Sequence, residues 1–250
     1  MYSYHIAFSL HYSFRMEMAR QNHACLFANP PIKCNFVKTI NQTQMLIRIH
    51  PETPSHRLIQ IVVDCLRQGG VIIYPTDTVY AIGCDLHQIK AVQRVAQIKG
   101  IKPEKANFSL ICHDLSYISD LTKPFSTSVY KAMKKALPGP YTFILNANNN
   151  VPKLFQSRKK TIGIRIPDNS IIREIVRELG NPIISTSVYD DDEILEYTTD
   201  PELIHEKYES LVDLVIDGGN GDNEASTVID CTGSEMVMIR EGKGDIESIF

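Results

Sequence analysis

From Met45 onward, apolar and polar positions follow two repeats that predict strands and helices. Short apolar runs rich in β-branched residues, of which Val71 to Tyr74 is the clearest, predict strands buried on both faces. Stretches whose apolar residues recur every three or four positions predict amphipathic helices. The predicted strands lie at residues 46–49, 71–74, 108–112, 141–145, 161–167, 182–186, 211–216, 227–231 and 236–240, and the predicted helices lie at residues 56–68, 87–98, 125–137 and 170–179. Strands and helices interleave without strict alternation, so we expect an α/β fold with a single twisted mixed sheet and flanking helices.

Two of these helices carry terminal signals. Ser55 is the candidate N-cap of the first helix, and Asp168 or Asn169 is the candidate N-cap of the helix at residues 170–179. Glycine follows both helices, at Gly69 and Gly180, where a left-handed backbone ends a helix at low cost.

Residues 1–44 show no sustained periodicity and carry almost no acidic side chains, and the pattern changes abruptly at Met45. We therefore expect residues 1–44 to be an N-terminal extension, either disordered or the result of an upstream start, and residues 45–250 to form the folded domain. A functional basic tail is the alternative interpretation of the extension.

The chain has 250 residues and 43% hydrophobic content, which suffices for one substantial core. It contains no apolar run long enough to cross a membrane, and its first residues do not resemble a secretory signal, so we expect a cytoplasmic protein without a membrane partner. The six cysteines are scattered and form no Cys-x-x-Cys pair. Buried free thiols are therefore expected rather than disulfides or a metal site.

The net charge of −3 conceals a division along the chain. Residues 91–165 hold 13 Lys and Arg against three acids, whereas residues 166–217 hold three against 14. This asymmetry predicts one positively charged surface suited to phosphates. Its candidate members are Lys99, Lys102, Lys105, Lys131, Lys134, Lys135, Arg158, Lys159 and Lys160. Ordinary solvated helix faces are the alternative interpretation.

A polar turn follows the predicted strand at residues 71–74. Pro75 cannot donate a hydrogen bond to a central strand, so Thr76, Asp77 and Thr78 should leave the sheet. Their hydroxyls and carboxylate could then meet a ligand. A strand followed by an Asx-type turn, without ligand, explains the same residues.

Several segments together resemble one family. They are the stretch Gly70 to Gly83, Lys99-Gly100, Leu137-Pro-Gly-Pro-Tyr-Thr-Phe143, Gly163-Ile-Arg-Ile-Pro167, Gly180 to Ser187, Ser226-Thr-Val-Ile-Asp230 and Ile239-Arg-Glu-Gly242. Their order and spacing are similar to those of the YrdC/YciO family, from about residue 45 to residue 250. The resemblance implies a twisted α/β fold with a basic concave face. It also implies threonylcarbamoyl-AMP synthase chemistry, in which L-threonine, bicarbonate and ATP give threonylcarbamoyl-AMP and pyrophosphate for the modification of a tRNA adenosine.

The resemblance assigns roles residue by residue. Lys99, Lys102 and Arg165 correspond to catalytic contacts with the nucleotide phosphates, where Mg²⁺ would share the charge of ATP. Substrate or nucleotide contacts correspond to Thr76, Thr78, His113, Thr142, Ser185, Ser187 and Arg240. Alternatives remain for several of them: salt bridges at strand ends for the arginines, a strand-end turn for the serines, and a surface position for His113.

Two positions depart from the synthase pattern and resemble the YciO branch. Ile101 stands where the Lys-x-Arg signature has arginine, and Tyr189 stands where the Ser-x-Asn signature has asparagine. Four acids, Asp190 to Glu193, follow and would repel a triphosphate unless they bind Mg²⁺ or point away, and a solvated turn is the favoured interpretation. The longer family members' extra C-terminal domain has no counterpart in this sequence. A divergent protein that binds a nucleotide or double-stranded RNA, without efficient synthase activity, is therefore the second hypothesis.

Overall fold

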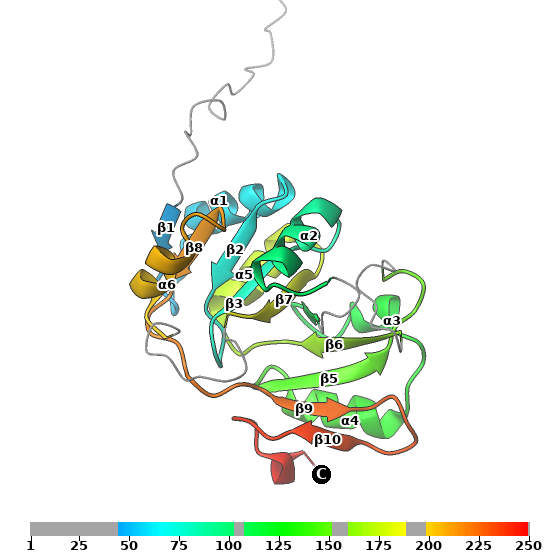
Figure 1. Cartoon of the computed structure of the whole chain (residues 1–250). Coiled ribbons are helices and arrows are strands. Elements are labelled where there is room, and N and C mark those ends of the chain that lie inside the picture. The colour runs from blue at the N-terminus through cyan, green and yellow to red at the C-terminus, as the bar shows by residue number, and fades with distance from the viewer. Residues whose placement is uncertain (1–44, 103–107, 152–159, 189–198, 250) are drawn as a thin grey trace, which may run out of the picture. The chain divides into compact units, whose positions relative to one another are not determined.

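The computed structural model describes residues 45–102, 108–151, 160–188 and 199–249, and these belong to one compact unit (Figure 1). The expected extension at residues 1–44 lies outside the described residues. No helix in the described part of the chain is both long enough and apolar enough to cross a membrane.

Ten strands of the described residues form one sheet in the order β1-β8-β2-β3-β7-β4-β6-β5-β9-β10. Their bounds are β1 Met45–Arg48, β2 Val71–Tyr74, β3 Ala81–Asp85, β4 Ser109–Ile111, β5 Tyr141–Asn146, β6 Thr161–Arg165, β7 Ile183–Ser187, β8 Leu214–Asp217, β9 Thr227–Asp230 and β10 Val237–Arg240. Parallel pairs such as β4 with β6 and antiparallel pairs such as β3 with β7 occur together. Figure 1 shows β2 running in a different direction from β5 and β6, which reflects the twist of the sheet. The predicted single mixed sheet is confirmed.

Helices cover the sheet on both faces. They are α1 His56–Arg67, α2 Ile89–Ile98, α3 Ile118–Leu121, α4 Thr127–Ala136, α5 Ser170–Leu179 and α6 Pro201–Tyr208, with a 3-10 turn, η4, at Ile246–Ser248. Apolar residues of α2, α4 and α6 join one buried cluster, and those of α1 and α5 join a second cluster. The sheet therefore separates two cores.

The strand register shows where one face of the sheet lies open. Arg165 pairs with Ile111, which belongs to the core under α1 and α5, so Arg165 points to that face. Across the sheet on the same face, Thr142 is buried, but Ile144 and Val228 are only half-buried. The neighbouring Phe143, on the opposite face, is fully buried in the other core. The helix cover of α1 and α5 therefore ends before β5 and β9, and it leaves a partly open polar surface.

Candidate functional site

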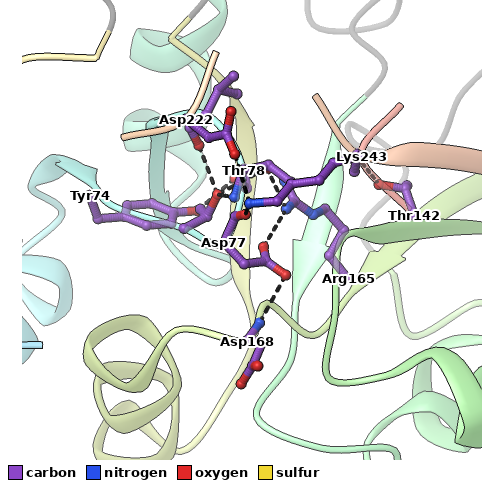
Figure 2. Close-up of polar contacts among 12 residues, drawn as sticks. Tyr74, Asp77, Thr78, Thr142, Arg165, Asp168, Asp222 and Lys243 are labelled. Atoms are coloured by element: carbon purple, nitrogen blue, oxygen red, sulfur yellow. Dashed lines mark hydrogen bonds and ion pairs between the residues drawn. The ribbon is translucent and has the colours of Figure 1, made fainter. Parts of the chain in front are cut away.

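A buried ion pair joins the turn after β2 to the end of β6. The Arg165 Nη2 group donates to Asp77 Oδ1 at 3.1 Å and to Thr78 Oγ1 at 2.9 Å. The other Asp77 oxygen accepts from the Asp168 backbone N–H at 3.0 Å, so Asp77 lies between Asp168 and Arg165 in Figure 2. The two charged side chains are only 10% and 9% exposed. The strand-end salt bridge considered for Arg165 is therefore present, in a position where it also fixes Thr78.

Arg165 has hydrogen-bonding capacity left over. Its Nε atom is buried and has no hydrogen-bond partner among the described residues. Burial lowers the pKa of the guanidinium, Asp77 opposes this effect, and the like charge of Arg240 adds to it. Two guanidinium groups are thus close enough to influence each other, and the Asp77 carboxylate pairs with Arg165 while Arg240 donates to Ser226. Such an arrangement favours an incoming anion.

The hydroxyls at the turn are ordered by one another. Thr76 Oγ1 donates to the Val79 carbonyl at 2.8 Å and accepts from the Thr78 backbone N–H at 3.1 Å. The two hydroxyl oxygens lie 3.1 Å apart, and Thr78 is fully buried. The turn is thus built by the threonine side chain at its start, which leaves Asp77 free to pair with Arg165.

Thr142 on β5, Ser226 directly before β9 and Arg240 at the end of β10 form a second cluster. Thr142 Oγ1 and Ser226 Oγ lie 2.8 Å apart, and Arg240 donates from Nε and Nη2 to the Ser226 carbonyl at 3.3 and 2.8 Å. The structure therefore brings together Thr142 and Arg240, two predicted contact residues that lie almost 100 positions apart. Ser226 is their common partner, and the sequence analysis placed it in a family segment without giving it a role.

An open groove of about 540 Å³ adjoins the turn. It is lined by Thr76, Asp77, Thr78, Thr199, Asn220, Gly221, Asp222, Asn223 and Lys243. Lys243 Nζ donates to Asp222 Oδ2 at 2.7 Å and to the Asp77 carbonyl at 2.8 Å, as Figure 2 shows. The hydrogen bond from Lys243 lowers the pKa of the Asp222 carboxyl. Sequence reasoning missed Lys243 and Asp222, although Lys243 directly follows the Ile239 to Gly242 segment.

Serines line the sheet between the turn and β6. Ser185 pairs with Ser109, and Ser109 pairs with Gly163 two positions before Arg165, so these positions share the face to which Arg165 points. Ser187 continues β7 on the same face and is half-buried. Ser109 was not predicted as a site residue.

The predicted lysines and the histidine lie in different surroundings. Lys99 Nζ donates to the Val188 carbonyl at 3.4 Å, directly after Ser187. Lys102 is exposed at the end of a described stretch. His113 Nδ1 lies 3.1 Å from the Arg173 carbonyl in a separate cavity of about 100 Å³ beside α5, so it does not line the groove.

The basic residues are also divided between the two faces. Helix α4 packs on the core opposite to Arg165, so its exposed lysines Lys131, Lys134 and Lys135 do not line the face that carries Arg165. Arg165, Arg240 and Lys243, in contrast, lie near the open face. Lys105, Arg158, Lys159, Tyr189 and the stretch Asp190 to Glu193 lie outside the described residues.

The family model named Sua5/yciO/yrdC, with the description "Telomere recombination", matches residues 64–242. The chain belongs to the Sua5/YciO/YrdC family. It is 43% identical to the uncharacterized protein YciO of Escherichia coli over 202 residues, which make up 80% of this chain and 96% of YciO. The crystal structure of E. coli YciO matches with a TM-score of 0.76 and 39% identity, over 83% of this chain and all of that chain.

Relatives named as synthases are less similar in sequence. The threonylcarbamoyl-AMP synthase of Chromobacterium violaceum is 35% identical over 137 residues, which are 55% of this chain and 70% of the synthase. The crystal structure of P. abyssi Sua5 complexed with L-threonine matches with a TM-score of 0.75 and 25% identity, over 82% of this chain and 59% of Sua5. The predicted family and sheet architecture are confirmed, and both the sequence and the fold of this member are close to YciO.

A metal ion held by the protein itself needs several oxygen, nitrogen or sulfur ligands that lie close together. Across the described ranges, no three His, Cys, Asp or Glu side chains gather closely enough to hold a metal ion. Asp77, the buried carboxylate of the site, already accepts from Arg165 and the Asp168 backbone. The described residues therefore do not fit a protein-held Mg²⁺ site.

Proposed function

We propose that this chain is a threonylcarbamoyl-AMP synthase-like enzyme that uses L-threonine, bicarbonate and MgATP. The observation that carries the proposal is the buried Arg165, which is held by Asp77 and Thr78 and keeps an unpartnered Nε at a half-open polar face. Such a fixed cation, next to Arg240 and several hydroxyls, suits an anion whose charge increases during the reaction. The similarity to synthases and to Sua5 complexed with L-threonine supports this substrate class.

The chemistry requires two bond-forming steps. The amine of L-threonine attacks the carbon of bicarbonate, and loss of water gives a carbamate. A carbamate oxygen then attacks the α-phosphorus of ATP, the bond from that phosphorus to the bridging oxygen breaks, and pyrophosphate leaves with the electron pair. Negative charge develops on the α-phosphate and on pyrophosphate, so cations at fixed positions lower the barrier.

Each candidate residue except His113, which lies in a separate cavity, receives a role in this scheme. Arg165 and Arg240 bind the carbamate or the α-phosphate, and Lys99 and Lys102 bind the departing pyrophosphate. Thr78, at the edge of the groove, contacts L-threonine. Thr76 holds the backbone of the turn, and Thr142, Ser185 and Ser187 offer hydroxyls to the nucleotide.

One observation favours a second candidate function. Ile101, at the signature position where the synthase pattern has arginine, is 39% exposed next to Lys102. An exposed isoleucine cannot bind a phosphate, so the cation count at this position is lower than in the synthase pattern. The alternative is a protein that binds a nucleotide, tRNA or double-stranded RNA without efficient threonylcarbamoyl transfer, and its RNA affinity would fall steeply with salt.

The test is pyrophosphate release by the full chain, supplied with MgATP and bicarbonate, with and without L-threonine. We expect release that depends on threonine and is lost in Lys99→Ala. The double variant Ile101→Arg, Tyr189→Asn restores the signature and should raise the rate. Release without any dependence on threonine, combined with salt-sensitive RNA binding, would favour the alternative.

A further inference from the structure

Tyr74 connects the buried core to the polar face through one hydrogen bond. Its hydroxyl donates to Ser185 Oγ at 2.6 Å, although the two residues lie 111 positions apart. Tyr74 is completely buried at the end of β2, and Ser185 is 3% exposed in β7. In Figure 2 the Tyr74 ring extends toward the Thr78 and Arg165 cluster. None of the predicted roles included Tyr74.

The contact depends on a glycine in the intervening strand. Strand β3 lies between β2 and β7, and Gly83 of β3 pairs with Ile72 on one side and with Ser185 on the other. A Cβ atom at Gly83 would lie 3.2 Å from Tyr74 Cε1 and 2.4 Å from the Ile184 carbonyl oxygen. The missing side chain therefore lets the tyrosine ring cross one strand and reach the serine.

The hydrogen bond also sets the direction in which Ser185 can donate. A phenol is a stronger acid than an aliphatic alcohol, so the tyrosine is the natural donor and the serine oxygen the acceptor. Burial raises the pKa of Tyr74, so the phenol keeps its proton at neutral pH. Ser185 Oγ has no other hydrogen-bond partner in the described part of the chain, and its own proton is therefore available. A buried donor without an acceptor is costly, which favours a ligand oxygen at this place.

We propose that Tyr74 is a positioning residue that holds Ser185 as a hydrogen-bond donor toward an oxygen of the bound anionic substrate. The identity of that substrate, MgATP or the carbamate, rests on the proposed function. Tyr74 does not touch the substrate itself. Its effect passes through Ser185, which shares a sheet face with Arg165 and lies opposite Ser109 in the neighbouring strand.

The experiment is a double-mutant cycle on the full chain with Tyr74→Phe, Ser185→Ala and the double variant. The readout is kcat/KM for MgATP in threonine-dependent pyrophosphate release. Each single change should lower kcat/KM roughly tenfold, since one hydrogen bond is involved, and the double variant should be no worse than Ser185→Ala. Additive losses, or an unchanged Tyr74→Phe, would overturn the proposal.

Two further variants distinguish a positioning role of Tyr74 from a general loss of protein stability. Tyr141→Phe also removes a buried hydroxyl, which bonds to the Asp245 carbonyl and Ser248 on the opposite face, and it should leave kcat/KM unchanged. If Tyr74→Phe does not fold, 4-aminophenylalanine at position 74 keeps the ring and a donor and should restore both folding and activity. Folding without activity in that variant would contradict the proposal.

The proposed function and this inference can fail separately. If the wild-type chain does not release pyrophosphate in a threonine-dependent manner, the proposed reaction is wrong. The affinity for MgATP is then measured by calorimetric titration in the four proteins of the double-mutant cycle. Non-additive losses of affinity in Tyr74→Phe and Ser185→Ala would still support the positioning role. Equal affinities in all four proteins, or no binding of MgATP by the wild type, would overturn it.

Discussion

At the scale of single residues, the site consists of groups whose partners lie far away in the chain. The resemblance to the family predicts Arg165, Thr78, Thr142 and Arg240 as contact residues, and this stays a prediction. The resemblance could not identify Asp77 as the partner of Arg165, because the turn after β2 and the end of β6 meet only after the sheet has formed. Sequence periodicity reports local structure, whereas these ion pairs and hydrogen bonds depend on tertiary contacts.

The ion pair of Asp77 with Arg165 gives a stability prediction. Asp77→Asn keeps the shape of the side chain but removes the charge that compensates a buried guanidinium. We expect the free energy of unfolding to fall by about 3 kcal/mol. Urea denaturation at pH 7 measures this loss of stability. The control is Asp222→Asn, because Asp222 is 32% exposed and its pair with Lys243 should contribute less than about 1 kcal/mol. Equal losses in the two variants would show that burial does not set the strength of the Arg165 pair.

Because Lys243 pairs with Asp222, we expect the free energy of unfolding to depend on pH. The hydrogen bond from Lys243 lowers the pKa of Asp222 in the folded state, so the pair stabilises the fold above the unfolded pKa of about 4. This contribution disappears as the pH falls through the folded pKa. Lys243→Gln should therefore destabilise the protein more at pH 7 than at pH 2, by less than about 1 kcal/mol because the pair is partly exposed. Denaturation at both pH values tests this, with Lys134→Gln on α4 as a control that should show no such difference.

At the scale of elements, the apolar pattern located most of the sheet and the long helices. The strand at residues 71–74 and the helix at residues 170–179 have the predicted bounds. Strand β3 was missed, because Ala81 and Gly83 have weak strand preferences and the strand is defined by its pairing with β2 and β7. Helix α6 was missed too, although Asp200 before Pro201 is a typical start signal.

The two predicted caps differ, and this difference can be measured. Asn169 Oδ1 accepts from the backbone N–H groups of Ile171 and Ile172, whereas Ser55 occupies the N-cap of α1 without a side-chain hydrogen bond. Asn169→Ala should therefore lower the free energy of unfolding by about 1 kcal/mol. Ser55→Ala should change it by at most a few tenths of a kcal/mol. Thermal or urea unfolding of both variants measures these changes. A larger loss of stability in Ser55→Ala than in Asn169→Ala would mean that the serine caps α1 in solution.

At the scale of the whole molecule, one sheet separates two cores that cover its two faces to different extents. The core under α2 and α4 is closed along β5 and β9, where Phe143 and Ile229 are fully buried. The core under α1 and α5 stops short of these strands and leaves the polar face beside it. Net charge along the sequence could not predict this division, because the lysines of α4 and Arg165 belong to the same basic stretch of the sequence but lie on opposite faces.

A shared sheet implies that both cores unfold together, and the cysteines can report this. Cys84, Cys112 and Cys231 belong to the core under α2 and α4, whereas Cys65 packs against the core under α1 and α5. Burial raises the pKa of Cys65, Cys112 and Cys231 to about 12, so the reactive thiolate is scarce in the folded protein at pH 8. Each thiol should therefore react slowly until the structure around it opens.

The measurement is labelling with a thiol reagent as a function of urea concentration, followed by mass spectrometry of each cysteine peptide. The protein is the full chain with Cys25→Ser and Cys34→Ser, because these two cysteines lie outside the described residues. The four remaining thiols should become reactive at one common midpoint, which matches the midpoint of circular dichroism. A lower midpoint for Cys65 alone would show that α1 and its core open independently, and that the helix cover beside the polar face is a separate unit of stability.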